Sequence, residues 1–164
     1  MATVYSTQRT NAIAIPSVKN KANELGGRVR IAHGVYEASS LASGDVIEMF
    51  ILPDGARIIS GSLAHDALGS STTLAVGHAA YVNAAGTTVA LDADEFRAAA
   101  ASTSAQKVDV AATLALGSGI EIDANQDGYT VTVTMGGAAG TGTIELTMLC
   151  LLYTSPSPRD GRES

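Results

Sequence analysis

The chain has 164 residues, a length that suits a single domain, and 46% of them are hydrophobic although only 4% are aromatic and none is Trp. Its 10 basic and 16 acidic residues give a net charge of −6, which disfavours a nucleic-acid partner because phosphate would be repelled. No apolar run is long enough to cross a bilayer and residues 1–9 are polar, so we expect neither a membrane partner nor a secretion signal.

The charge is distributed unevenly along the chain. Residues 1–30 contain five basic residues against Glu24 alone, a net charge of +4, whereas residues 31–149 contain 3 basic and 13 acidic residues, a net charge of −10. Weak hydrophobic periodicity predicts an extended N-terminal arm over residues 1–27. We expect this arm either to be solvated or to dock on an acidic surface of a neighbouring copy. The candidate partner-binding residues are Lys19, Lys21, Arg28 and Arg30.

Four β-strands are predicted after the arm, over residues 28–38, 45–52, 57–66 and 72–82. The first alternates three aliphatic residues with polar or aromatic ones: Val29, Ile31 and Val35 against Arg28, Arg30 and Tyr36. A period of two is typical of a half-buried strand, so we expect the aliphatic side chains on the buried face. Pro53, Asp54 and Gly55 favour a turn between the second and third strands.

One helix is predicted, over residues 92–101. Asp92 can cap the free N–H groups of a first turn, and Glu95 follows three residues later, as in a capping box. The four alanines at 98–101 favour the helical conformation.

The region after this helix predicts further strands. Alternation of apolar residues covers 108–114 and 129–135, where Tyr129 begins the clearer run, and returns at 144–148. The glycine-rich segment Gly136–Gly142 is expected to be a flexible loop. About eight short strands with frequent turns indicate an antiparallel β-sandwich or jelly roll over residues 28–149.

The last fifteen residues differ from the rest of the chain. Residues 150–160, CLLYTSPSPRD, resemble the in-frame translation of a transposon-end sequencing adapter over eleven consecutive positions. We therefore expect residues 150–164 to be a non-native, adapter-derived tail and the native chain to be truncated near Leu149. The alternative is a genuine flexible tail rich in Pro and Ser. If the tail is non-native, Cys150 has no role, and the native part has no cysteine for disulfide or thiol chemistry.

One segment could bind calcium. Asp123, Asn125, Asp127 and Gly128 match the first half of a calcium loop, in which alternate oxygen-bearing side chains ligate the ion. The twelfth position of such a loop carries a bidentate Glu, but here it is Thr134. A hairpin turn, which favours Asp, Asn and Gly, is the simpler interpretation.

No other pattern predicts catalysis. His33, His65 and His78 lie on different predicted strands without paired ligands nearby. Alternation places His33 and His78 on the apolar faces of their strands, so we expect core or interface histidines satisfied by hydrogen bonds. The sequence contains no nucleophile elbow, phosphate loop or dinucleotide fingerprint. We therefore expect no enzymatic activity and no cofactor.

Four segments carry a resemblance to a known group of proteins: Gly26–Ala32, Ile47–Arg57, Leu68–His78 and Val108–Gly117. Over residues 1–149 the chain resembles small virion structural proteins of tailed phages of marine bacteria, including T7-like phages, and an adapter-tailed read from a marine metagenome fits such a source. The resemblance implies a non-enzymatic component of the virion. We expect a homo-oligomer that decorates and stabilises the capsid. The alternative is a tail-associated or host-recognition module that binds a receptor through loops such as Gly136–Gly142.

Overall fold

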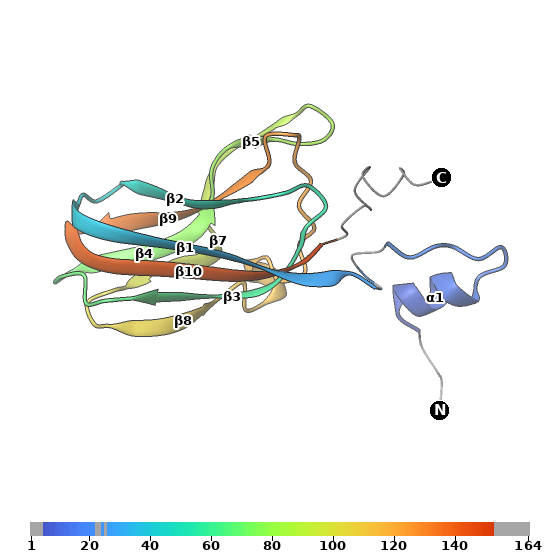
Figure 1. Cartoon of the computed structure of the whole chain (residues 1–164), viewed down its shortest axis with the longest axis horizontal. Coiled ribbons are helices and arrows are strands. Elements are labelled where there is room, and N and C mark those ends of the chain that lie inside the picture. Colours follow the sequence, from blue (N-terminus) through green and yellow to red (C-terminus); the bar gives the residue numbers. More distant parts are fainter. Residues whose placement is uncertain (1–4, 22–23, 25, 153–164) are drawn as a thin grey trace, which may run out of the picture.

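The computed structural model describes residues 5–21, 24 and 26–152. Two four-stranded sheets lie face to face as layers (Figure 1), and every strand pairing is antiparallel, which confirms the predicted antiparallel β-sandwich. The long strands are β1 (Arg28–Leu41), β2 (Val46–Leu52), β3 (Arg57–His65), β4 (Thr72–His78), β7 (Asp92–Ala101), β8 (Gln106–Val110), β9 (Tyr129–Gly137) and β10 (Gly140–Leu152).

The strands alternate between the two sheets. One sheet has the order β1-β10-β3-β8 and the other the order β2-β9-β4-β7. A separate hairpin pairs β5 (Tyr81–Val82) with β6 (Thr88–Val89), and a single 3-10 turn, η1, covers Leu114–Leu116. Because most connections cross from one layer to the other, the core between the layers is built from residues far apart in the sequence.

The core consists mainly of aliphatic side chains from both layers, as the composition predicts. Leu63 and Leu146 from one sheet and Val76 and Val133 from the other are fully buried. The layers approach closely where side chains are small: a Cβ on Gly34 would lie 2.8 Å from the carbonyl oxygen of Met49.

The buried face of β1 is opposite to the one predicted. Val29, Ile31 and Val35 are 57%, 69% and 57% exposed. The register with β10 explains this outcome, because Ala32 lies opposite the buried Met148, and paired residues share a face of the sheet. The aliphatic residues therefore point outward, and the small residues of β1 face the core.

The predicted helix at residues 92–101 is wrong, since this segment is strand β7. It pairs with β4 and buries Phe96 completely, while Ala98 and Ala99 are exposed. Asp92 does cap a backbone N–H, that of Asp94 at 3.0 Å, but within a turn at the start of a strand. Helix propensity is a weak prior that pairing and burial override.

The arm contains a helix that was not predicted. Residues Thr7–Ile13 form α1, where an extended conformation was expected. The Ser6 hydroxyl accepts a hydrogen bond from the backbone N–H of Arg9, which caps the first turn. Pro16 disfavours helix for the residue before it, which places the end of α1 near Ala14. The helix lies beyond the end of the sandwich at which β1 begins (Figure 1).

The segment Gly136–Gly142 is a tight turn that crosses from one sheet to the other and not the flexible loop that was predicted. Only Ala138 and Ala139 separate β9 from β10. The Ala138 N–H donates to the Ser71 carbonyl at 3.1 Å, and the Thr141 N–H donates to the Leu68 carbonyl at 2.9 Å. These bonds tie the turn to the body.

The proposed junction at Leu149 lies inside β10. Cys150 is buried, and residues 150–152 pair with the start of β1, while the rest of the predicted tail, 153–164, lies outside the described residues. Burial raises the pKa of the Cys150 thiol to about 11, which keeps it protonated and unreactive at neutral pH.

Candidate functional site

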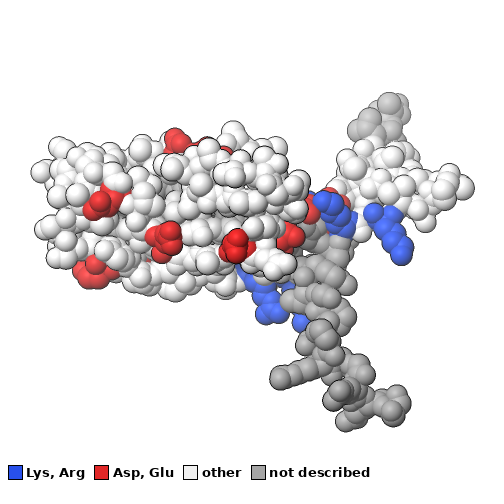
Figure 2. All heavy atoms as spheres, turned by 90° about the horizontal axis from the view of Figure 1, so that it is seen from above, with Lys and Arg blue, Asp and Glu red and all other residues white. Residues whose placement is uncertain are grey.

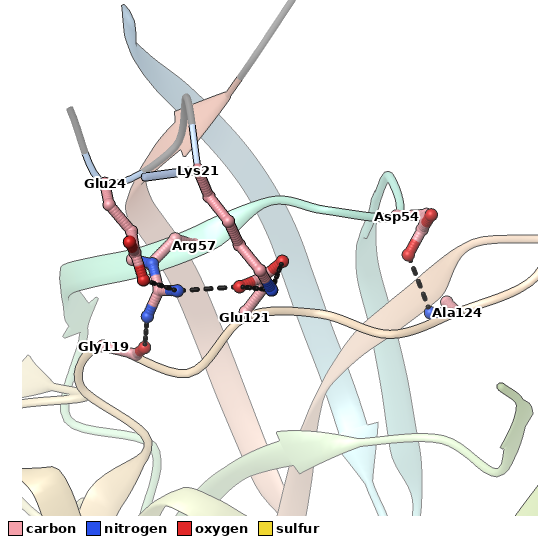
Figure 3. A network of polar contacts seen from close by, with 7 residues as sticks. All are labelled: Lys21, Glu24, Asp54, Arg57, Gly119, Glu121 and Ala124. Carbon is pink, nitrogen blue, oxygen red and sulfur yellow. Dashed lines mark hydrogen bonds and ion pairs between the residues drawn. The ribbon is translucent and has the colours of Figure 1, made fainter. Parts of the chain in front are cut away.

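A cluster of charged residues joins the arm to the body at one end of the sandwich (Figure 3). Arg57, the first residue of β3, donates from Nη2 to Glu121 Oε2 at 2.7 Å and to Glu24 Oε1 of the arm at 3.5 Å. Its Nη1 donates to the Gly119 carbonyl at 2.6 Å. Lys21 of the arm completes the cluster, because its Nζ lies 2.9 Å from both carboxylate oxygens of Glu121. We call Lys21, Glu24, Arg57, Gly119 and Glu121 the arm latch.

The arm latch is reciprocal: a cation of the arm contacts an anion of the body, and an anion of the arm contacts a cation of the body. The Arg57 side chain is 24% exposed, so its contacts are partly shielded from water, whereas Lys21 is 64% exposed. An exposed ion pair is weakened by salt and contributes little alone. Two ion pairs therefore attach the arm, Lys21 to Glu121 and Glu24 to Arg57, and Arg57 takes part in both because it also bonds to Glu121.

Arg57, Glu24 and Glu121 were not predicted from the sequence as contact residues. The signal that could have indicated them is that Glu24 is the sole acidic residue in the basic arm. Its partner could not be identified, since Arg57 lies 33 residues away in the chain.

The predicted partner-binding residues do not act as one group. The Lys21 ammonium contacts Glu121 of its own chain, while Lys19, Arg28 and Arg30 are exposed. In Figure 2 acidic side chains are spread along the visible face of the sandwich, whereas Lys and Arg are seen towards the end that carries the arm. Contact of these cations with a partner stays a prediction.

The three calcium candidates lie in the turn before β9. The Asn125 amide donates to Asp127 Oδ2 at 3.0 Å, and Asn125 Oδ1 accepts from the Asp127 N–H at 3.0 Å. Asp123 Oδ1 accepts from the Ala84 N–H at 3.2 Å. These bonds are those of a closed polar turn, and the calcium hypothesis stays a prediction.

The three histidines lie in different environments. His33 is about half exposed, contrary to the buried position that strand alternation predicted, and its Nδ1 lies 3.0 Å from the Thr147 hydroxyl. His65 and His78 are buried, and each has its Nδ1 2.8 Å from the carbonyl of the following residue. Within residues 5–21, 24 and 26–152, no three His, Cys, Asp or Glu side chains gather closely enough to hold a metal ion.

Replacement of Arg57 by methionine is expected to release the base of the arm. The variant loses the bonds to Glu24, Glu121 and Gly119, and hydrogen bonds of charged groups contribute roughly 1.5–3 kcal/mol each at most. We expect the free energy of unfolding to fall by about 1–2 kcal/mol. Hydrogen exchange of the arm amides should become faster, and proteolysis of the arm should accelerate.

The matched control is Arg28→Met, which removes an exposed cation near the same end of the molecule. If both variants leave arm exchange and proteolysis at the wild-type rates, the arm latch does not hold the arm.

Comparisons with known proteins place the fold. No protein-family model and no curated protein matches the chain. A chain of the capsid of Ralstonia phage GP4 is similar in structure, with a TM-score of 0.58 and 25% identity over 79% of this chain and 87% of that chain. A chain of the cyanophage Pam1 capsid asymmetric unit has a TM-score of 0.60 and 18% identity over 93% of this chain and 100% of that chain. The similarity to the Ralstonia phage GP4 chain supports a structural role in a phage virion, and the similarity to the Pam1 chain shows the shared fold.

Within the described part of the chain, no helix is long and apolar enough to span a bilayer.

Proposed function

We propose that this chain is a non-enzymatic structural protein of a phage virion that decorates the capsid as a homo-oligomer. The observation that carries the proposal is its likeness to a chain of the Ralstonia phage GP4 capsid, which extends over most of both chains at 25% identity. The cyanophage chain supports the proposal further. It is matched over its full length and belongs to the Pam1 capsid asymmetric unit.

The sheet topology supports a jelly roll. Counting the eight long strands in chain order, one sheet contains strands 1, 8, 3 and 6, and the other contains strands 2, 7, 4 and 5. In the jelly rolls of viral capsid proteins, two four-stranded sheets are joined in this way, with most connections crossing from one sheet to the other.

The arm presents surface for a neighbour. None of the α1 residues is buried, and the apolar side chains of Ile13, Ile15 and Val18 are 44%, 99% and 52% exposed. Apolar groups gain free energy when they leave water, so an arm that its own body does not cover favours contact with another subunit. The acidic body of a second copy complements the basic charge of this arm.

The outer face of the β1 sheet presents a second surface. The exposed aliphatic side chains of β1 lie beside aliphatic side chains of β10, because Val29 pairs with Leu151 and Ile31 pairs with Leu149. We call Val29, Ile31, Val35, Leu149 and Leu151 the outer stripe. The occupant that we propose is a second copy, because β1 is also the edge of its sheet and an apolar edge strand favours association between copies.

Co-expression with the other head genes of the parent phage tests this function. A decoration protein is expected to add to shells that form without it, and the purified chain should be a small oligomer by analytical ultracentrifugation. Ile31→Lys should weaken self-association about tenfold or more, because a charge would enter an apolar contact. Leu114→Lys, at an 86% exposed site outside the outer stripe, is the control.

Two other outcomes would change the assignment. Shells built from this chain alone, or shells that fail to form without it, would make it a major shell component. Binding of the purified chain to host cells and not to heads would favour the tail-associated or host-recognition module, an interpretation that the tight Gly136–Gly142 turn does not favour.

A further inference from the structure

A pocket of about 440 Å³ opens between β7, the β5–β6 hairpin and the segment before β9. Its lining includes three carboxylates that the function above does not use, Asp92, Glu95 and Asp123, together with the tyrosines Tyr81 and Tyr129. Among the described residues that line it, none is Lys or Arg. A fourth acid, Glu121, faces Lys21 and Arg57 in the arm latch, so its charge is already balanced.

Aromatic rings form one wall of the pocket. The Tyr129 ring centroid lies 4.9 Å from those of both His78 and Tyr81. Tyr129 is only 4% exposed, and no described residue forms a hydrogen bond with its hydroxyl. Among the described residues, this hydroxyl is not one of the fully buried polar atoms that lack a partner, so it is accessible from the pocket, where a ligand or water can bond to it.

The carboxylates line the same pocket as these rings. Burial, then the charges of Tyr81, Glu95 and Asp92, raise the pKa of Tyr129. Burial, then Asp123 and Glu95, likewise raise the pKa of Tyr81. The Glu95 carboxylate has no hydrogen-bond or ion-pair partner among the described residues, and the pocket therefore carries uncompensated negative charge.

The spacing of the acids favours an organic cation over a metal ion. A metal needs several oxygens within about 2–2.6 Å of one point, and no three acids or histidines of the described residues meet that condition. A guanidinium or an alkylammonium group is larger, donates several hydrogen bonds and stacks on aromatic rings. A pocket lined by both carboxylates and aromatic rings fits such a group.

We propose that this pocket, the cation pocket, binds the guanidinium group of an arginine or the ammonium group of a lysine from another protein molecule. Glu95 and Asp123 accept hydrogen bonds from the cation, and Tyr81 and Tyr129 contact it with their rings and hydroxyls. The binding of a cation does not depend on the proposed function. The source of the cation does, since the exposed Arg9 and Lys19 of the arm of a second copy are the candidates that the oligomer supplies.

The binding test uses a charged probe and its neutral analogue. N-acetyl-arginine amide and N-acetyl-citrulline amide, which have nearly the same shape, are titrated into the full chain while backbone NMR signals are recorded. We expect saturable shifts around Tyr81, Glu95 and Tyr129 with the arginine probe only. Glu95→Gln and Tyr129→Phe should each weaken binding by about fivefold or more. Glu48→Gln, at an exposed acid of β2, is the matched control and should not change the affinity.

Equal shifts with both probes, no saturation, or an affinity that Glu95→Gln and Tyr129→Phe leave unchanged would overturn the proposal. These outcomes would not affect the proposed function, whose test is the assembly on heads.

The source is tested in the oligomer itself. If the arm of a second copy supplies the cation, Arg9→Gln or Lys19→Gln should weaken self-association as much as Glu95→Gln does. The double variant should then be no weaker than either single variant. If the arginine probe binds but the arm variants associate normally, the cation pocket is confirmed and the arm is rejected as its source.

Discussion

Phe96→Ala is expected to lower the free energy of unfolding by about 3–5 kcal/mol, the largest loss that we predict for a single side chain. Phe96 is fully buried, and its ring centroid lies 6.1 Å from that of Tyr129. It also packs on Gly117, where an added Cβ would come within 2.7 Å of the Phe96 ring. Neighbours packed this closely on both sides of the ring cannot move in to fill the cavity. The loss of unfolding free energy therefore includes both the lost burial and the empty volume.

Urea denaturation of the purified chain measures this loss. Leu91→Ala is the control, because Leu91 is also a large apolar residue next to β7 but is 65% exposed, and a change within about 0.5 kcal/mol is expected. A loss for Phe96→Ala no larger than that of Leu91→Ala would mean that β7 does not pack into the core as described. The helix that propensity predicted for residues 92–101 would then need to be reconsidered.

Gly77→Ala is expected to cost about 3 kcal/mol or more, although it adds a single methyl group. A Cβ at this position of β4 would collide with the backbone of Asp92 and Ala93 at the start of β7. Backbone atoms cannot rotate away as side chains can, so the two strands would have to separate. The pairing of His78 with Asp92 should then be lost, and hydrogen exchange should accelerate at the start of β7.

The comparison with Gly86→Ala isolates the effect of this collision. Gly86 has a positive φ of 82° in the turn of the β5–β6 hairpin, but a Cβ there would meet no atom within 4 Å. Its substitution should cost only the backbone strain of a left-handed alanine, about 1–2 kcal/mol. Equal losses for the two variants would contradict the close approach of β4 and β7.

The buried face of a strand was predicted correctly where the apolar residues of its alternating pattern face the core. In β9 the apolar residues Val131, Val133 and Met135 are buried, and the pattern alone was sufficient to place them. In β1 the pattern was equally clear, but Val29 and Ile31 point outward. A period of two identifies a strand without saying which face is buried, because that depends on the partner strand and its register.

The wrong helix prediction for residues 92–101 and the missed arm latch have a common physical cause. The local preference of the alanines at 98–101 for helix is small, whereas pairing with β4 and burial of Phe96 are tertiary effects that no local window contains. The arm latch is hidden for the same reason, since Arg57 and Glu121 are 64 residues apart. Lys21 was predicted to bind a partner, and in the structure its ammonium contacts Glu121 of its own chain.

The position of β10 in its sheet has a consequence for how the protein is made. This strand lies between β1 and β3, and Arg28 pairs with Leu152, so β1 has no partner in its sheet until β10 has been synthesised. Until then the sheet is split, and Leu63 of β3 lacks its neighbour Leu146. Contacts this distant in sequence form slowly. The sheet therefore cannot close before β10 has left the ribosome, and the unpaired β1 is exposed to aggregation and proteolysis until then.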